Sequence, residues 1–218
     1  MASLRREYES ERTPMVLSGN IGPRGDGYRP DATMSAEEAE DYHAEQIGVF
    51  AETEADMVGV FTMNTVEEAL GAARAAADAG MPAAISFTLE TNGRLPTGET
   101  LREAVEAVDD ATDGAPAYYM INCAHPTHFE AMLGAGEEWT RRVRGLRANA
   151  SKRSHAELDE AKDLDDGDPA ELGREYRALM RKLPMLTVLG GCCGTDHRHV
   201  EAISQACAAH AEKAARAA

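Results

Sequence analysis

The chain has 218 residues, 43% of them hydrophobic, so it is long enough to bury a core, and its length favours a single domain. Its 38 acidic residues outnumber the 22 basic ones and give a net charge of −16, which disfavours nucleic acid and anionic lipid as partners. No apolar run approaches the length of a membrane span, and the first ten residues are too charged for a signal peptide. We therefore expect a cytoplasmic protein that binds neither nucleic acid nor membrane and acts on a small neutral or cationic substrate.

Strand and helix patterns alternate along the chain. A helical pattern over residues 1–13 ends at Pro14, and Ser35 and Glu38 form a capping-box pattern at the start of the next helix. Short apolar runs predict six strands, at residues 15–19, 56–62, 83–88, 117–122, 145–149 and 186–189. Helices are predicted at residues 35–52, 65–79, 100–110, 126–133, 169–182 and 197–214. The acidic stretch 157–168 is interpreted as solvated surface.

This alternation indicates an α/β fold with parallel strands and right-handed crossovers. The sheet is then either doubly wound or closed into a barrel, and in both cases the functional site lies at the carboxyl ends of the strands. Three segments follow predicted strands and are expected at this edge: the Gly- and Pro-rich loop 20–30, the pair Asn122-Cys123, and the run 190–195.

Three cysteines at two predicted strand ends, Cys123, Cys192 and Cys193, suggest a zinc site. Zinc prefers thiolates in a tetrahedral shell, and a catalytic zinc keeps three protein ligands and one open position. A substrate thiol in that position would be deprotonated more easily, and the anionic site would leave its sulfur nucleophilic, which is the chemistry of alkyl transfer to sulfur. Only four cysteines occur, without an export signal, so we do not expect a disulfide scaffold.

Other interpretations of these residues remain open. From spacing alone, a Cys-Cys pair beside glycines is more often buried packing or a structural metal corner than a catalytic zinc site. The pair Gly190-Gly191 could instead expose backbone N–H groups to a phosphate. Cys207 is interpreted as a core or surface thiol. Histidines near the cysteines are interpreted as loop or helix-terminus residues rather than as ligands or proton carriers; they are His125, His128, His197 and His199.

The segment Ile121-Asn122-Cys123, together with Gly190-Gly191-Cys192-Cys193-Gly194-Thr195, resembles the homocysteine S-methyltransferase family. The segments 21–23, 85–87 and 95–98 also match markers of that family, and the resemblance extends from about residue 15 to 205. It implies a (βα)8 TIM-type barrel in which Cys123, Cys192 and Cys193 bind Zn²⁺. Homocysteine thiolate would be the fourth ligand and would accept a methyl group to give methionine. The resemblance also places Asn122, Phe61 and Gly22 at substrate-binding positions, and Asn122, which adjoins a metal ligand, could equally have a structural role in orienting its loop.

The sequence departs from the family in two respects. Only six βα units are predicted where the family has eight, so we expect residues 1–218 to form one N-terminally shortened barrel domain. Such a chain would be a truncated gene product or would need a further chain, such as a homo-oligomer partner, to cover its open edges. Phe61 stands where the family usually has a glutamate that binds the amino group of homocysteine.

Together these features predict a zinc-dependent S-methyltransferase. It would move a methyl group from an onium-type donor to a thiol, with homocysteine as the favoured acceptor, so its partners would be a small-molecule thiol and a methyl donor. The alternatives are a different thiol acceptor, a degenerate zinc-binding barrel without catalysis, and a barrel enzyme that binds phosphate through the late glycines.

Overall fold

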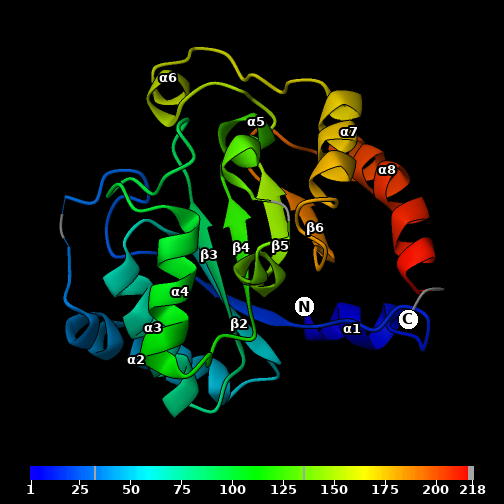
Figure 1. Ribbon diagram of the computed structural model, residues 1–218. Helices are drawn as coiled ribbons and strands as arrows, with labels where there is room; N and C mark the ends of the chain where they lie inside the picture. The colour runs from blue at the N-terminus through cyan, green and yellow to red at the C-terminus, as the bar shows by residue number, and fades with distance from the viewer. Residues whose placement is uncertain (32, 135, 216–218) are drawn as a thin grey trace.

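The protein forms one curled sheet of six parallel strands, in a computed structural model that describes residues 1–31, 33–134 and 136–215 (Figure 1). The strands are β1 (Ser18–Ile21), β2 (Met57–Met63), β3 (Ala83–Thr88), β4 (Tyr118–Asn122), β5 (Val143–Ala148) and β6 (Val188–Gly191). Each strand pairs in parallel with the one before it, so the order in the sheet follows the chain. A doubly wound sheet would reverse this order at a switch point, so the fold is of the barrel type. Because β1 and β6 are not paired with each other, the barrel is incomplete.

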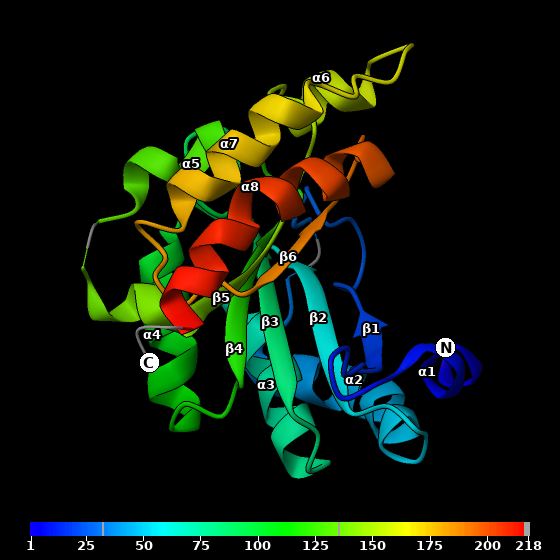
Figure 2. The ribbon, with the colours of Figure 1, turned by 90° about the vertical axis from the view of Figure 1, so that its right-hand side faces the viewer.

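Helices follow the strands and cover one face of the sheet (Figure 2). They are α2 (Ala36–Ala51), α3 (Val66–Asp78), α4 (Leu101–Thr112), α5 (Pro126–Phe129), α6 (His155–Asp159), α7 (Pro169–Leu179) and α8 (His197–Ala215). The first helix, α1 (Ala2–Tyr8), lies beyond β1 with no buried residue, held by an ion pair of 2.8 Å between Arg5 and Asp56. No helix among the described residues is long and apolar enough to cross a membrane.

The hydrophobic core lies between the helices and the sheet face that they cover. Strand residues such as Val60, Ile85 and Leu146 have no exposed surface, and α3 contributes a stripe of buried alanines. These small residues allow α2 and α3 to pack closely. At Gly71 a Cβ atom would lie 2.5 Å from the carbonyl oxygen of Ala36 on α2, so the contact requires glycine.

The predicted elements are present in the predicted order, and most differ only by small shifts at their ends. The first helix was predicted to end at Pro14 but ends at Tyr8, because the backbone of Glu9 is extended. The helix predicted at residues 126–133 is the short helix α5 followed by a 3-10 helix, η1 (Glu130–Met132).

The capping box is present: Glu38 N–H donates to Ser35 Oγ (3.2 Å), and Ser35 N–H donates to the Glu38 carboxylate (2.9 Å). The first strand begins three residues later than predicted, because Leu17 N–H donates to the Asp56 carboxylate (2.7 Å) instead of joining the sheet.

Two further differences lie in the second half of the chain. The last strand is shifted toward the C-terminus, because the Leu186 N–H bonds to Leu183 in a turn and pairing with β5 begins at Val188. Gly190 and Gly191 are therefore inside β6 rather than after it. The stretch predicted as plain surface begins within a short capped helix, α6, and a 3-10 helix, η2 (Glu138–Arg142), precedes β5; neither was predicted.

Candidate metal and substrate site

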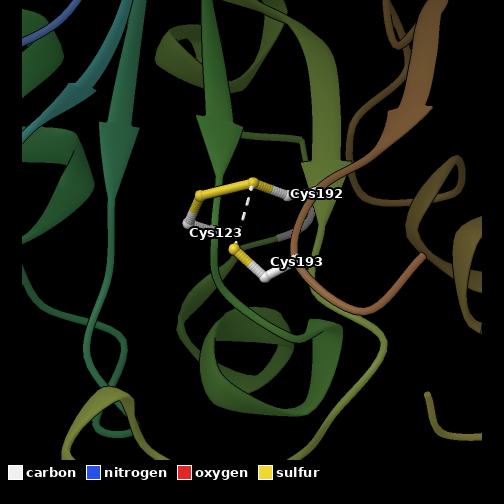
Figure 3. Close-up of side chains that lie close together, drawn as sticks. All are labelled: Cys123, Cys192 and Cys193. Atoms are coloured by element: carbon white, nitrogen blue, oxygen red, sulfur yellow. Dashed lines mark hydrogen bonds between the residues drawn. A yellow bond between two sulfur atoms is a disulfide. The ribbon is translucent and has the colours of Figure 1, made fainter. Parts of the chain in front are cut away.

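Three cysteine sulfurs come together at the carboxyl ends of β4 and β6 (Figure 3). The Sγ atoms of Cys123, Cys192 and Cys193 all lie within 4.8 Å of one another, although the first two residues are 69 positions apart. The structure joins Cys123 and Cys192 as a disulfide with a Cα–Cα distance of 5.5 Å, and Cys193 Sγ lies 4.0 Å from Cys192 Sγ. Folding thus unites the predicted trio, whereas Cys207 stays buried and unpaired in α8.

Neighbouring cysteines such as these can exist as a disulfide or as free thiols. A disulfide offers no thiolate, so the expectation of free thiols at all three positions does not hold for the state in the structure. Reduction would give three thiols at the same places. Tetrahedral zinc with Zn–S bonds of about 2.3 Å sets sulfurs about 3.8 Å apart, a spacing that this cluster can adopt. Cys123 is buried and Cys193 exposed, so the cluster has a closed side and an open one, as a three-thiolate site with a vacant position requires.

One buried amide, that of Asn149, connects the two segments that present the cysteines. Its Nδ2 donates to the Cys123 carbonyl (3.0 Å), and its Oδ1 accepts from the Cys193 N–H (3.1 Å). The Cys123 carbonyl also contacts His155 Nε2 (2.6 Å), and the Cys123 N–H donates to the Arg147 carbonyl (3.0 Å). These bonds hold Cys123 at a φ of 55°, a left-handed conformation that is uncommon for residues other than glycine.

The predicted site residue Asn122 is buried, and its side chain bonds to the protein itself. Its Oδ1 accepts from Thr62 N–H (2.9 Å) and Ser86 Oγ (2.6 Å), while its Nδ2 donates to Thr62 Oγ1 (2.8 Å). Thr62 has a φ of 61° at an irregularity in the pairing of β2 with β3, which costs free energy in a β-branched residue unless neighbours hold it. These contacts favour the orienting role of Asn122 over direct contact with substrate.

Phe61 and Gly22 lie at the same edge of the sheet, at the ends of β2 and β1. The Phe61 ring covers Gly59, where a Cβ atom would lie 2.6 Å from ring atom Cε2. On the Phe61 ring lies the Arg147 guanidinium, with its Cζ 5.0 Å from the ring centroid. A Cβ on Gly22 would be 3.9 Å from the Phe61 carbonyl. Substrate contact by either residue stays a prediction.

A cavity of about 370 Å³ opens beside Cys193. Its walls include Asp26, Tyr28, Glu90, Asn149, His155 and Cys193. The rings of Tyr28 and His155 pack with centroids 4.0 Å apart. Burial raises the pKa of Tyr28 to about 12, and the neighbouring Cys193 adds to the shift, so the phenol is neutral at physiological pH.

Sequence reasoning singled out Cys193 and the loop that carries Asp26 and Tyr28, but not Glu90, Asn149 or His155. Asn149 could have been found, because it directly follows a strand of the sheet. Glu90 and His155 come from segments 65 residues apart and carry no local signal; their side chains lie 3.3 Å from each other.

The histidines near the cysteines in sequence make other contacts. His125 Nε2 lies 3.3 Å from a Glu175 carboxylate oxygen; burial lowers the pKa of His125 to about 4 and raises that of Glu175 to about 7. His128 bonds to a backbone carbonyl, and His199 contacts the Asp196 carboxylate within one turn. Among the described residues, the three cysteines form the only cluster of potential metal ligands. This supports the interpretation of the histidines as loop and helix-terminus residues.

Comparison with known proteins gives a consistent result. The family model "Homocysteine S-methyltransferase" matches residues 1–207. The chain is 23% identical over 208 residues to "Homocysteine S-methyltransferase 3" of Arabidopsis thaliana, covering 90% of this chain and 58% of the relative. It is 25% identical over 217 residues to "Homocysteine S-methyltransferase 4" of Zea mays, covering 92% and 61%. The chain thus spans about three-fifths of the length of these curated relatives.

Solved structures with the same fold include the homocysteine methyltransferase MmuM of Escherichia coli. Its oxidized form matches with a TM-score of 0.69 at 20% identity, covering 94% of this chain and 65% of that one. Its metallated form matches with a TM-score of 0.67 at 19% identity and the same coverage. The incomplete barrel seen here therefore has the architecture of part of a longer α/β barrel.

Proposed function

Since this chain belongs to the homocysteine S-methyltransferase family, we propose that it takes part in methyl transfer from an onium-type donor to a thiol, with homocysteine as the favoured acceptor. We further propose that Cys123, Cys192 and Cys193, in their reduced state, bind Zn²⁺. The observation that carries this proposal is the convergence of three sulfurs, from the ends of two strands, within 4.8 Å of one another.

In this proposal each part of the site has a separate role. When bound, Zn²⁺ would lower the pKa of an acceptor thiol so that it is a thiolate near neutral pH. The three cysteines hold the ion, Asn149 keeps their two segments in register, and the open side of the cluster at Cys193 admits the acceptor. The acceptor thiol would release its proton to solvent, and its sulfur would form a bond to the methyl carbon. The bonding pair of the cleaved C–S⁺ or C–N⁺ bond would remain on the donor sulfur or nitrogen, which thereby loses its positive charge.

The cavity beside Cys193 supports a cationic donor. One cation, Arg29, lines the cavity, and it is paired with the Asp159 carboxylate at 3.6 Å. The aromatic rings of Tyr28 and His155 and the carboxylates of Asp26 and Glu90 would therefore favour a sulfonium or quaternary ammonium group over an anion. Binding the donor there would place its methyl group next to the cysteine cluster. Alignment of this kind supplies much of the acceleration in bimolecular transfer.

Metal analysis of the reduced protein tests the proposal. We expect about one zinc per chain in the native protein, a loss of nearly all of it in Cys192→Ala, and retention in Cys207→Ala, the matched control outside the cluster. A methyl-transfer assay with sulfonium and quaternary ammonium donors then tests activity. Zinc-free native protein after reduction, or equal zinc in the two variants, would contradict the metal site. Zinc-loaded protein without transfer would favour the non-catalytic alternative.

A further inference from the structure

Arg147 lies near the end of β5, on the face of the sheet opposite to that of its core neighbour Leu146. It is exposed on β5, whereas its neighbour Leu146 is fully buried. The side chain extends across Gly190, where a Cβ atom would lie 3.5 Å from Arg147 Cγ, and its guanidinium lies over the Phe61 ring with Cζ 5.0 Å from the centroid. Glycine at position 190 and the flat ring of Phe61 thus fix where this cation lies.

The guanidinium is only partly used by the protein. Its Nε donates to the Gly191 carbonyl at 3.4 Å, and in the described part of the chain neither terminal nitrogen has a hydrogen bond or a carboxylate partner. Arg142 shows the contrast: its Nε and Nη2 both bind the Asp109 carboxylate, at 2.7 and 2.8 Å. In a chain with a net charge of −16, Arg147 keeps a free pair of donors in the geometry that suits a carboxylate.

Both the backbone and the guanidinium of Arg147 contact segments that carry the cysteines. The Arg147 carbonyl accepts from the Cys123 N–H (3.0 Å), and the Gly191 carbonyl that Arg147 contacts immediately precedes Cys192. A small molecule with its thiol at the cluster and a carboxylate a few bonds away would bring that carboxylate to the guanidinium. The supporting ring of Phe61 has no hydrogen-bond acceptor for an ammonium group.

We propose that Arg147 binds the carboxylate of the acceptor. This inference rests on the proposed function and assigns a residue that binds its acceptor. Arg147 acts as a specificity-determining residue, and Phe61 as the surface that positions it.

Isothermal titration of the reduced full chain tests the inference without turnover. The ligands are homocysteine, 4-mercaptobutanoate, which lacks the amino group, and 3-mercaptopropylamine, which lacks the carboxylate. We expect Arg147→Met to lower the affinity for the two thiols that carry a carboxylate by about 10- to 100-fold, and the affinity for the amine by less than about threefold. Arg147→Lys keeps the positive charge but not the paired N–H donors of the guanidinium, so its affinity for the carboxylates should lie between those of the native chain and Arg147→Met. Arg144→Met, at another exposed arginine of the same strand, should change none of them.

The outcomes separate this inference from the proposed function. Equal weakening of all three thiols by Arg147→Met, or no binding of any of them to the native chain, would overturn the role of Arg147. Carboxylate-dependent binding that Arg147→Met removes, in a protein that transfers no methyl group, would support the role of Arg147 and overturn the catalytic proposal.

Discussion

Replacement of Asn149 by alanine should both destabilise the fold and weaken the metal site. Asn149 is 1% exposed, and its amide bonds to both cysteine-bearing segments, through the Cys123 carbonyl and the Cys193 N–H. Alanine removes both bonds and offers no substitute. The Cys123 carbonyl keeps its contact with His155. The other segment keeps two backbone bonds, from Cys192 N–H to the Ala148 carbonyl and from Ala150 N–H to the Cys193 carbonyl, but the side-chain link between the two segments is lost.

The magnitude follows from these contacts. Each net hydrogen bond contributes about 1 kcal/mol, so Asn149→Ala should lower the free energy of unfolding by about 2 kcal/mol. Hydrogen bonds that orient the ligands of a metal typically contribute about 10- to 100-fold to metal affinity, and we expect Asn149→Ala to lower the zinc affinity by a factor in that range.

Urea unfolding of the reduced protein measures the first effect, and competition for zinc with a chelator measures the second. Asn92→Ala is the matched control: Asn92 is exposed and caps a loop through one bond to the Arg94 N–H (3.0 Å). A loss of stability in Asn149→Ala no larger than in Asn92→Ala, with unchanged zinc affinity, would refute the argument that this amide connects the two segments.

Two further predictions concern burial and packing. Because burial raises the pKa of Glu175 to about 7 while His125 stays neutral, the folded state holds the Glu175 proton more tightly than the unfolded state does. Raising the pH from about 4.5 to 7 should therefore destabilise the native chain relative to Glu175→Gln, by about 1 kcal/mol given the partial exposure of the group. Unfolding at pH 5 and 8.5 checks this, with exposed Glu45→Gln as the control, and a pH-independent difference would contradict it. Gly71→Ala should lower the Tm by about 3 to 6 °C, because overlap with α2 outweighs the gain in helix propensity. Gly48→Ala, where the added methyl meets nothing within 4 Å, should raise the Tm. Tm shifts of the same sign in the two variants would contradict the argument that close packing against α2 determines the effect at Gly71.

Much of the architecture was predictable because it depends on local patterns. Short apolar runs indicated the six strands and helical spacing of apolar residues the main helices, and the Ser35–Glu38 capping box marked the start of α2 within one residue. The rule that sites lie at the carboxyl ends of parallel strands was enough to place Cys123 and the vicinal cysteines at one edge. Their chemistry as soft ligands follows from residue type alone.

Other features needed the folded chain. The disulfide, the Asn149 bridge and the stacking of Arg147 on Phe61 each join residues far apart in sequence. The start of β6 depended on which backbone groups the preceding turn had already used. No local sequence pattern indicates these contacts or this strand boundary.

The sequence by itself therefore determined the order and type of the elements, and the kind of chemistry that three thiols at strand ends can support. Only the tertiary structure decided which polar groups meet them: the cavity of Tyr28, Glu90 and His155, and the half-used guanidinium of Arg147. The physical reason is that secondary structure follows from interactions between near neighbours. A site is made where strand register and loop path bring distant side chains within a few ångströms of each other.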